Sequence, residues 1–181
     1  MKNLKLFLGD KKGAVTVEFI AMMMFLAFIF AFLSDVIVMR STMGRLDNAS
    51  YTLVNILRER LQLYAGTADI SDRDYKQMEL LAKRLIYGDQ NSKEELNIVL
   101  EYWSEKKQTR LPHAINRCQP YRNLRDLSYL SPKSEFNNER RIPLYQVTVC
   151  VESKSLFQVL LVSKRDRVEG LMRSSSMSVS R

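Results

Sequence analysis

The chain has 181 residues, a formal net charge of +8 at pH 7, two cysteines and a single histidine. This length provides for one compact domain together with an anchor. The basic residues are scattered rather than gathered into a stripe, which argues against a nucleic-acid-binding protein. One histidine and the absence of a Cys-x-x-Cys motif argue against a zinc site, and we expect no metal and no cofactor.

The first 39 residues combine a basic leader with a long apolar stretch. Lys11, Lys12 and Gly13 stand directly before the stretch, and residues 19–33 include no polar side chain. At 1.5 Å per residue, residues 14–39 would form a helix of about 39 Å, compared with a bilayer core of about 30 Å. We therefore predict a transmembrane helix over residues 14–39.

Glu18 places a carboxylate near the start of this stretch, and the residues one turn later are Ala21 and Met22. An unpaired charge in hydrocarbon costs on the order of several kcal/mol and usually marks a function. One interpretation is that Glu18 stays hydrated at the depth of the headgroups. The other is that cleavage after Gly13 frees the amine of Ala14, which then pairs with Glu18 of a neighbouring copy.

The order of these residues resembles a class III (type IV pilin-like) prepilin signal. The leader ends at Gly13, Ala14 would be the first mature residue, and Glu18 and Phe19 would be the fifth and sixth. The run Gly-Ala-Val-Thr-Val-Glu-Phe is similar to that of the TadE/TadF-type minor pilins, or pseudopilins, of the tight-adherence (Flp) pilus system. A chain of this size with a C-terminal domain that has two cysteines looks most like TadF.

The resemblance implies a role in a surface fibre. A membrane prepilin peptidase would cleave between Gly13 and Ala14, and the mature protein would be required to assemble a pilus that mediates adhesion. The implied partners are this peptidase, other pilins and pseudopilins, an inner-membrane assembly platform and membrane lipid. The subunit would be a single-pass inner-membrane protein that could enter an extracellular pilus.

Charges on the two sides of the apolar stretch predict its orientation. Four lysines precede it, whereas Arg40 and Arg45 follow it. The positive-inside rule then leaves the N-terminus in the cytoplasm and the C-terminal domain in the periplasm. A secretory signal peptide fits less well, because the apolar region is long and no small-x-small cleavage site precedes Asp35.

Leucines continue at helical spacing after the apolar stretch, at Leu46, Leu53, Leu57 and Leu61. We predict that the helix extends through residues 40–66, with Gly66 as its stop. The alternative is two helices that join near Gly44.

A second helix is predicted between Ser71 and Gly88. Ser71 is a favourable N-cap, and Asp74 stands three residues later, as in a capping box. Asp69, Asp72 and Asp74 could also form a metal site, but the helix dipole already explains negative charge at a helix start. We therefore expect no metal there.

Alternating apolar residues predict strands at residues 96–103, 144–152, 157–162 and 171–179. The first of these could instead form a helix, and the last could be a frayed tail. Residues 106–112 are predicted to be a turn. The expected fold class is α+β: the long N-terminal helix continues into a small domain in which a helix packs on a mostly antiparallel sheet.

Cys118 and Cys150 are the two cysteines. In a domain outside the cytoplasm they predict one disulfide, whereas in the cytoplasm they would be two buried thiols. Tyr121 could line a binding surface or belong to the core. His113 follows Pro112 in the presumed turn and is predicted to lie at the surface.

No nucleotide-binding loop, metalloprotease motif or nucleophile–base set is found in the sequence. The paired acids are predicted to lie on solvated faces: Glu94 with Glu95, and Glu101 with Glu105. We therefore expect a protein that is not an enzyme.

The predicted organisation has four parts: a leader (residues 1–13), a transmembrane helix (14–39), a helix extension (40–66) and an extracytoplasmic domain (67–181). The expected function is that of a minor pilin-like protein. The alternative is an uncleaved single-span anchor that holds an adhesive or ligand-binding domain. A third hypothesis, an envelope enzyme, lacks a catalytic set.

Overall fold

The computed structural model describes residues 14–64, 69–90, 92–113, 117–134, 140–153 and 170–180. The chain divides into two compact units, one of Met1–Arg40 with Lys154–Arg167 and one of Ser41–Ser153 with Val168–Arg181. Three predicted features lie outside the described residues: the leader at residues 1–13, the helix stop at Gly66 and the strand at residues 157–162.

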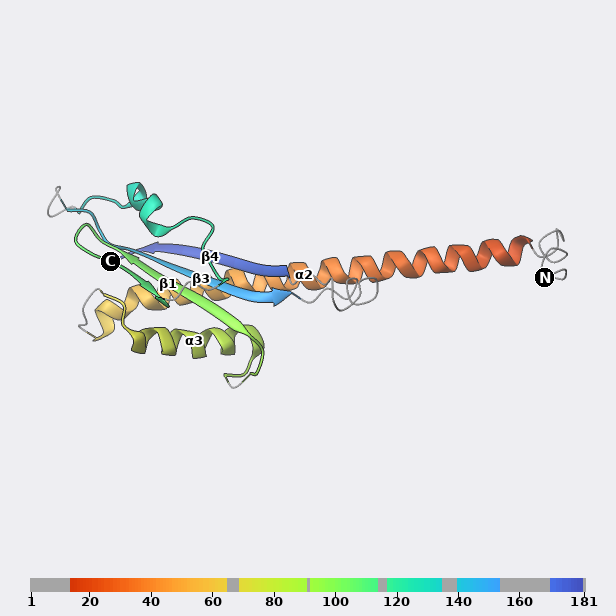
Figure 1. Ribbon diagram of the computed structural model, residues 1–181, viewed down its shortest axis with the longest axis horizontal. Coiled ribbons are helices and arrows are strands. Elements are labelled where there is room, and N and C mark those ends of the chain that lie inside the picture. The colour runs from red at the N-terminus through yellow and green to blue at the C-terminus, as the bar shows by residue number, and fades with distance from the viewer. Residues whose placement is uncertain are drawn as a thin grey trace. The chain divides into compact units, whose positions relative to one another are not determined.

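One long helix, α2, runs from Ala14 to Tyr64 (Figure 1). No proline occurs before Pro112, so no residue in this stretch lacks the backbone N–H that a helix needs. Residues on both sides of Gly44 belong to the same helix, as the continued leucine spacing predicted. The alternative of two helices joined at Gly44 is wrong.

The second helix, α3, spans Asp72–Tyr87 and has the ends that the sequence predicted. The Asp74 N–H donates to the Ser71 hydroxyl, and the Ser71 N–H donates to the Asp74 carboxylate at 2.9 Å. Gly88 closes the helix with a positive φ of 77°, which glycine adopts without steric cost. The capping box and the stop are therefore confirmed.

Four antiparallel strands form one sheet in the order β2-β1-β3-β4. Their bounds are β1 Leu96–Trp103, β2 Gln108–Leu111, β3 Leu144–Ser153 and β4 Gly170–Val179. The predicted strands at 96–103, 144–152 and 171–179 are confirmed, and so is the α+β fold class.

The predicted turn at residues 106–112 is partly wrong, because β2 occupies most of it. The turn itself is tight: the Ser104 N–H donates to the Lys107 carbonyl at 2.8 Å. The chain then returns along β1, with Leu100 opposite Leu111. A strand of four residues is too short to display an alternating pattern that the sequence could reveal.

The apolar core lies between the two helices and one face of the sheet. On β3, Tyr145, Val147, Val149 and Val151 belong to this core, as their alternation predicted. From α2 the core receives five side chains that are at most 2% exposed: Leu46, Ala49, Leu53, Val54 and Leu57. Their spacing of three and four residues sets one stripe of the helix against the sheet.

The other face of the sheet carries the remaining side chains of β3, which include Gln146, Thr148 and Cys150. These side chains are buried as well. Gln146 and Cys150 contact a mostly irregular segment, residues 117–134, that includes the short 3₁₀ helix η1 (Leu124–Leu130). We call residues 117–134 the strap.

Candidate functional site: the apolar helix and the strap

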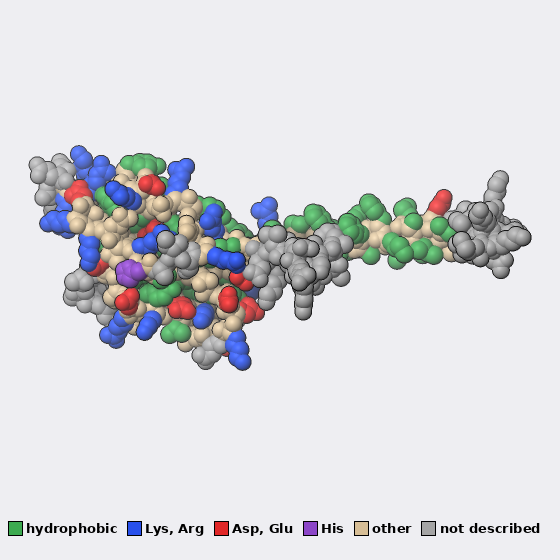
Figure 2. Space-filling view, viewed as in Figure 1, with side chains coloured by type: hydrophobic (Ala, Val, Ile, Leu, Met, Phe, Trp, Pro, Cys, Tyr) green, Lys and Arg blue, Asp and Glu red, His purple; other side chains and the backbone are tan. Residues whose placement is uncertain are grey.

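The first candidate region is the N-terminal part of α2. Large apolar side chains of residues 15–39 are exposed here, for example Phe25 at 65% and Phe30 at 62%. Figure 2 shows these side chains along the helix, in contrast to the mixed charges of the domain. Within the described residues, α2 is the one helix long and apolar enough to cross a membrane. This region is compatible with a single-pass anchor.

Two predicted site residues, Glu18 and Phe19, lie near the start of α2, and both side chains are exposed. Ala14 is the first helical residue, whereas Gly13 lies outside the described residues. The carboxylate of Glu18 forms no ion pair within the part of the chain that the structure describes. Cleavage after Gly13 and the pairing of Glu18 with a new amine remain predictions.

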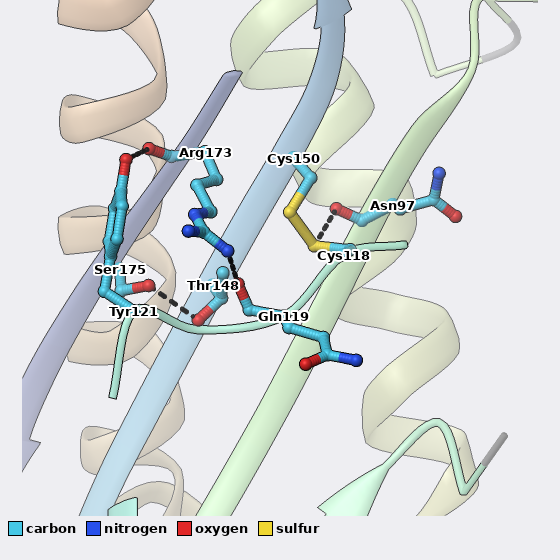
Figure 3. The surroundings of a disulfide bond; sticks show 8 residues. All are labelled: Asn97, Cys118, Gln119, Tyr121, Thr148, Cys150, Arg173 and Ser175. Carbon is cyan, nitrogen blue, oxygen red and sulfur yellow. Dashed lines mark hydrogen bonds between the residues drawn. A yellow bond between two sulfur atoms is a disulfide. The ribbon is translucent and has the colours of Figure 1, made fainter. Parts of the chain in front are cut away.

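The second candidate region is the disulfide between Cys118 and Cys150, which confirms the predicted bridge. It joins the strap to β3, with the two Cα atoms 5.7 Å apart (Figure 3). Both cysteines are fully buried, and Val99 and Leu171 pack against them. The chain-entropy model assigns about 3–4 kcal/mol of stability to a bridge that closes a loop of this length.

Hydrogen bonds also hold the part of the strap that follows Cys118. The guanidinium of Arg173 donates to the Gln119 carbonyl at 3.0 Å and lies 4.1 Å from the centre of the Tyr121 ring. The Tyr121 hydroxyl donates to the Arg173 carbonyl at 3.5 Å (Figure 3). The Gln146 side-chain amide donates to the Arg122 carbonyl at 3.1 Å. The strap is therefore attached mainly through polar groups.

Glu101 lies under the strap and is only 3% exposed, so the prediction of a solvated face is wrong for this residue. The Leu124 N–H donates to its carboxylate at 3.3 Å, and the Arg110 guanidinium lies 3.9 Å away. Burial raises the pKa of Glu101, while the Leu124 N–H and Arg110 partly oppose the shift and Asp126 adds to it.

Gln146 is the cross-strand neighbour of Glu101 in the β1–β3 ladder. Its side-chain oxygen is buried and has no hydrogen-bond partner within the described part of the chain. A protonated Glu101 could donate to this oxygen, whereas an ionised one could not. Protonation of Glu101 would therefore supply a possible donor for this oxygen.

The other candidates are distributed over the domain and do not converge on one site. Asp74 caps α3, while Asp69 accepts from the Thr109 hydroxyl at 2.7 Å and pairs with Lys107. Desolvation acts to raise the pKa of Asp69, but the bonds from Lys107 and Thr109 outweigh it and lower the pKa. His113 is exposed. No group of three metal-binding side chains occurs among the residues that the structure describes.

In a comparison with known protein families, a family model matches residues 6–181 of the chain. The matching family is TadF, described as "Putative tight adherence pilin protein F". The searches of curated proteins and of solved structures found no match. Because the family match extends over nearly the entire chain, this protein belongs to the TadF family of tight adherence pilin proteins.

Proposed function

We propose that this chain is a minor pilin-like subunit that a prepilin peptidase cleaves after Gly13 and that is required to assemble a tight adherence pilus. Family membership supports a pilin-like role in such a pilus. The observation that carries the proposal is the apolar part of α2, where large side chains such as Phe25 and Phe30 are exposed among the described residues. A membrane first, and the helices of other subunits later, would cover it.

The four predicted parts fit this function. The leader (residues 1–13) would be removed, and residues 14–39 would anchor the mature chain in the inner membrane. Residues 40–66 would connect the anchor to a periplasmic domain over residues 67–181. Partners would be the peptidase, other pilins and pseudopilins, the assembly platform and lipid. The role would be structural rather than enzymatic.

Glu18 would set the axial register of the assembled helices. Cleavage would create an ammonium group on Ala14, and the carboxylate of a neighbouring copy would pair with it in an environment of low dielectric constant. Glu18→Ala should therefore leave cleavage largely intact and impair assembly. Normal pili in that variant would exclude the register role.

The mass of the intact protein extracted from membranes tests the cleavage. In cells that possess the peptidase, the chain should lack its first thirteen residues. Gly13→Trp should block this processing, because a bulky side chain hinders entry of the scissile bond into the protease. Gly9→Trp, the same change within the leader, is the matched control and should still mature.

A full-length mass for the unaltered chain in such cells would overturn the proposal. It would favour instead an uncleaved anchor that holds an adhesive or ligand-binding domain at the membrane. The exposed apolar helix is compatible with that function too, and cleavage is the property that separates the two.

A further inference from the structure

The two edges of the sheet differ in how they are protected. The edge strand β2 has four residues, includes Arg110 and is followed directly by Pro112. The opposite edge strand, β4, has ten residues, no proline and a single charged residue, Arg173. Proteins usually protect an exposed edge by shortening it or by placing proline and charges on it. Only β2 follows this rule.

The backbone groups of β4 that face away from β3 can be identified from two hydrogen bonds. The Ser180 N–H donates to the Pro143 carbonyl at 2.8 Å, so even-numbered residues direct their backbone groups toward β3. The carbonyl of Arg173 meets the Tyr121 hydroxyl on the side of β4 away from β3 (Figure 3). The odd-numbered residues of β4 therefore direct their backbone N–H and C=O groups away from β3: Leu171, Arg173, Ser175, Met177 and Val179.

No strand of the described residues pairs with this outer edge. The Tyr121 bond to the Arg173 carbonyl is long, and the Tyr121 side chain is 63% exposed, so an incoming chain could displace it. A row of outward N–H and C=O groups is complementary to one kind of ligand, the backbone of an extended peptide.

Side chains of helix α2 contact the serine side chains of β4. The Ser50 hydroxyl lies 3.0 Å from that of Ser174 and 2.8 Å from that of Ser176. Further along, the Arg58 guanidinium donates to the Ser178 hydroxyl at 3.4 Å. These contacts with α2 order the strand before any partner arrives.

We infer that β4 is a docking edge for an extended strand of a different pilus subunit, which pairs with it in the antiparallel direction. The sheet is antiparallel throughout, and this pairing is the more stable one. β4 has one positive charge, Arg173, and no negative one, so a partner strand that carries a carboxylate complements this edge, whereas a second β4 would bring only another positive charge. The inference rests on the proposed function, since it names a partner for the same subunit.

Site-directed crosslinking in cells that assemble the pilus tests the inference. Both native cysteines form the disulfide, so an introduced cysteine is the only free thiol. A photoreactive maleimide on Ser175→Cys should crosslink to a second, different protein of the pilus. The same label on Gln77→Cys, at an exposed position of α3, is the matched control and should not.

Two further substitutions examine the pairing itself in the Ser175→Cys background. Met177→Pro removes an outward N–H and no hydrogen bond to β3, so it should abolish the crosslink while the circular dichroism spectrum stays unchanged. Arg173→Gln keeps every backbone group and a side-chain N–H for the Gln119 carbonyl, and it should weaken the crosslink by removing the positive charge. If Met177→Pro does not fold, the substitution at Arg173 provides the test of the pairing.

The outcomes separate this inference from the proposed function. If the chain is cleaved and pili form, but Ser175→Cys gives no crosslink or one no stronger than Gln77→Cys, the docking edge is excluded and the pilin role stands. A crosslinked product with the mass of two copies of this chain also overturns the inference, because it identifies self-pairing. An uncleaved chain overturns the proposed function instead.

Discussion

The two faces of the sheet are both buried, but different interactions cover them. On one face, α2 and α3 pack leucine, valine and isoleucine side chains against β1 and β3. On the other face, the strap is attached by a disulfide, a carboxyl group and several backbone carbonyls. Regular helices can bring a continuous apolar stripe to a sheet, whereas an irregular segment must satisfy its own backbone groups as it covers one.

The largest expected effect comes from opening a cavity in the helix-covered face. Leu53 is fully buried in α2, and Leu53→Ala should lower the free energy of unfolding by about 2–5 kcal/mol. Chemical denaturation of the detergent-solubilised full chain measures this. Ile56→Ala is the control on the same helix, because Ile56 is 40% exposed and should change stability much less. Equal losses for the two variants would contradict the packing described here.

Removal of the disulfide tests the strap-covered face. The double variant Cys118→Ala, Cys150→Ala should lose about 3–4 kcal/mol, since the unfolded chain regains the entropy of an open loop. Hydrogen exchange should show where the structure loosens. The Leu124 N–H should exchange faster. The amides of Leu53 and its neighbours in α2 should still exchange only when the whole domain unfolds. Uniform loss of protection would mean that the two faces are not independent.

The buried carboxyl group of Glu101 should make the strap-covered face sensitive to pH. Its pKa is raised above the ordinary value of 4.5, so the folded state binds the proton more tightly than the unfolded state does. Stability should therefore fall as pH rises from about 4.5 through the raised pKa, and stay reduced above it.

Glu101→Gln should remove this loss and stabilise the protein at pH 7, with little difference from the unaltered chain below pH 4.5. The new amide can also donate to the side-chain oxygen of Gln146. Glu105→Gln is the matched control, because it makes the same change at an exposed side chain and should leave the stability nearly unchanged. Thermal unfolding across pH 4–8 distinguishes them, and a stabilisation that is independent of pH would argue against a protonated Glu101.

The smallest effect is expected at the serine contacts between α2 and β4. Ser50→Ala removes the hydroxyl group that contacts Ser174 and Ser176 and should cost about 1 kcal/mol. Ser34→Ala is the control, because the Ser34 hydroxyl only donates to the Phe30 carbonyl within the exposed part of α2. If Ser50→Ala costs as little as Ser34→Ala, the serine contacts do not stabilise β4.

Features that local chemistry determines could be predicted from the sequence. The caps at Ser71 and Gly88 follow from side-chain hydrogen bonding and from the backbone freedom of glycine. The alternation in β3 predicted which side chains face the helices. The length of α2 followed from unbroken helical spacing without proline. The presence of two cysteines predicted the disulfide.

Features that depend on distant segments could not be predicted. Glu101 is buried because the strap crosses it, and no periodic pattern in residues 117–134 indicates where that segment lies. The pairing of β2 depends on the turn at Ser104–Lys107 and on the side chain of Asp69, which comes from a segment far earlier in the chain. The candidate processing site at Gly13 is a property of the sequence alone.

The bridge between Cys118 and Cys150 also imposes an order on maturation. Disulfides persist in oxidising compartments and are rare in the cytosol. A domain that folds in a reducing compartment would complete its leucine-rich side, while the segment over Glu101 would be held by hydrogen bonds without the covalent link. Chains made in a reducing host should therefore have a packed apolar core and a weakly held strap until an oxidant forms the disulfide.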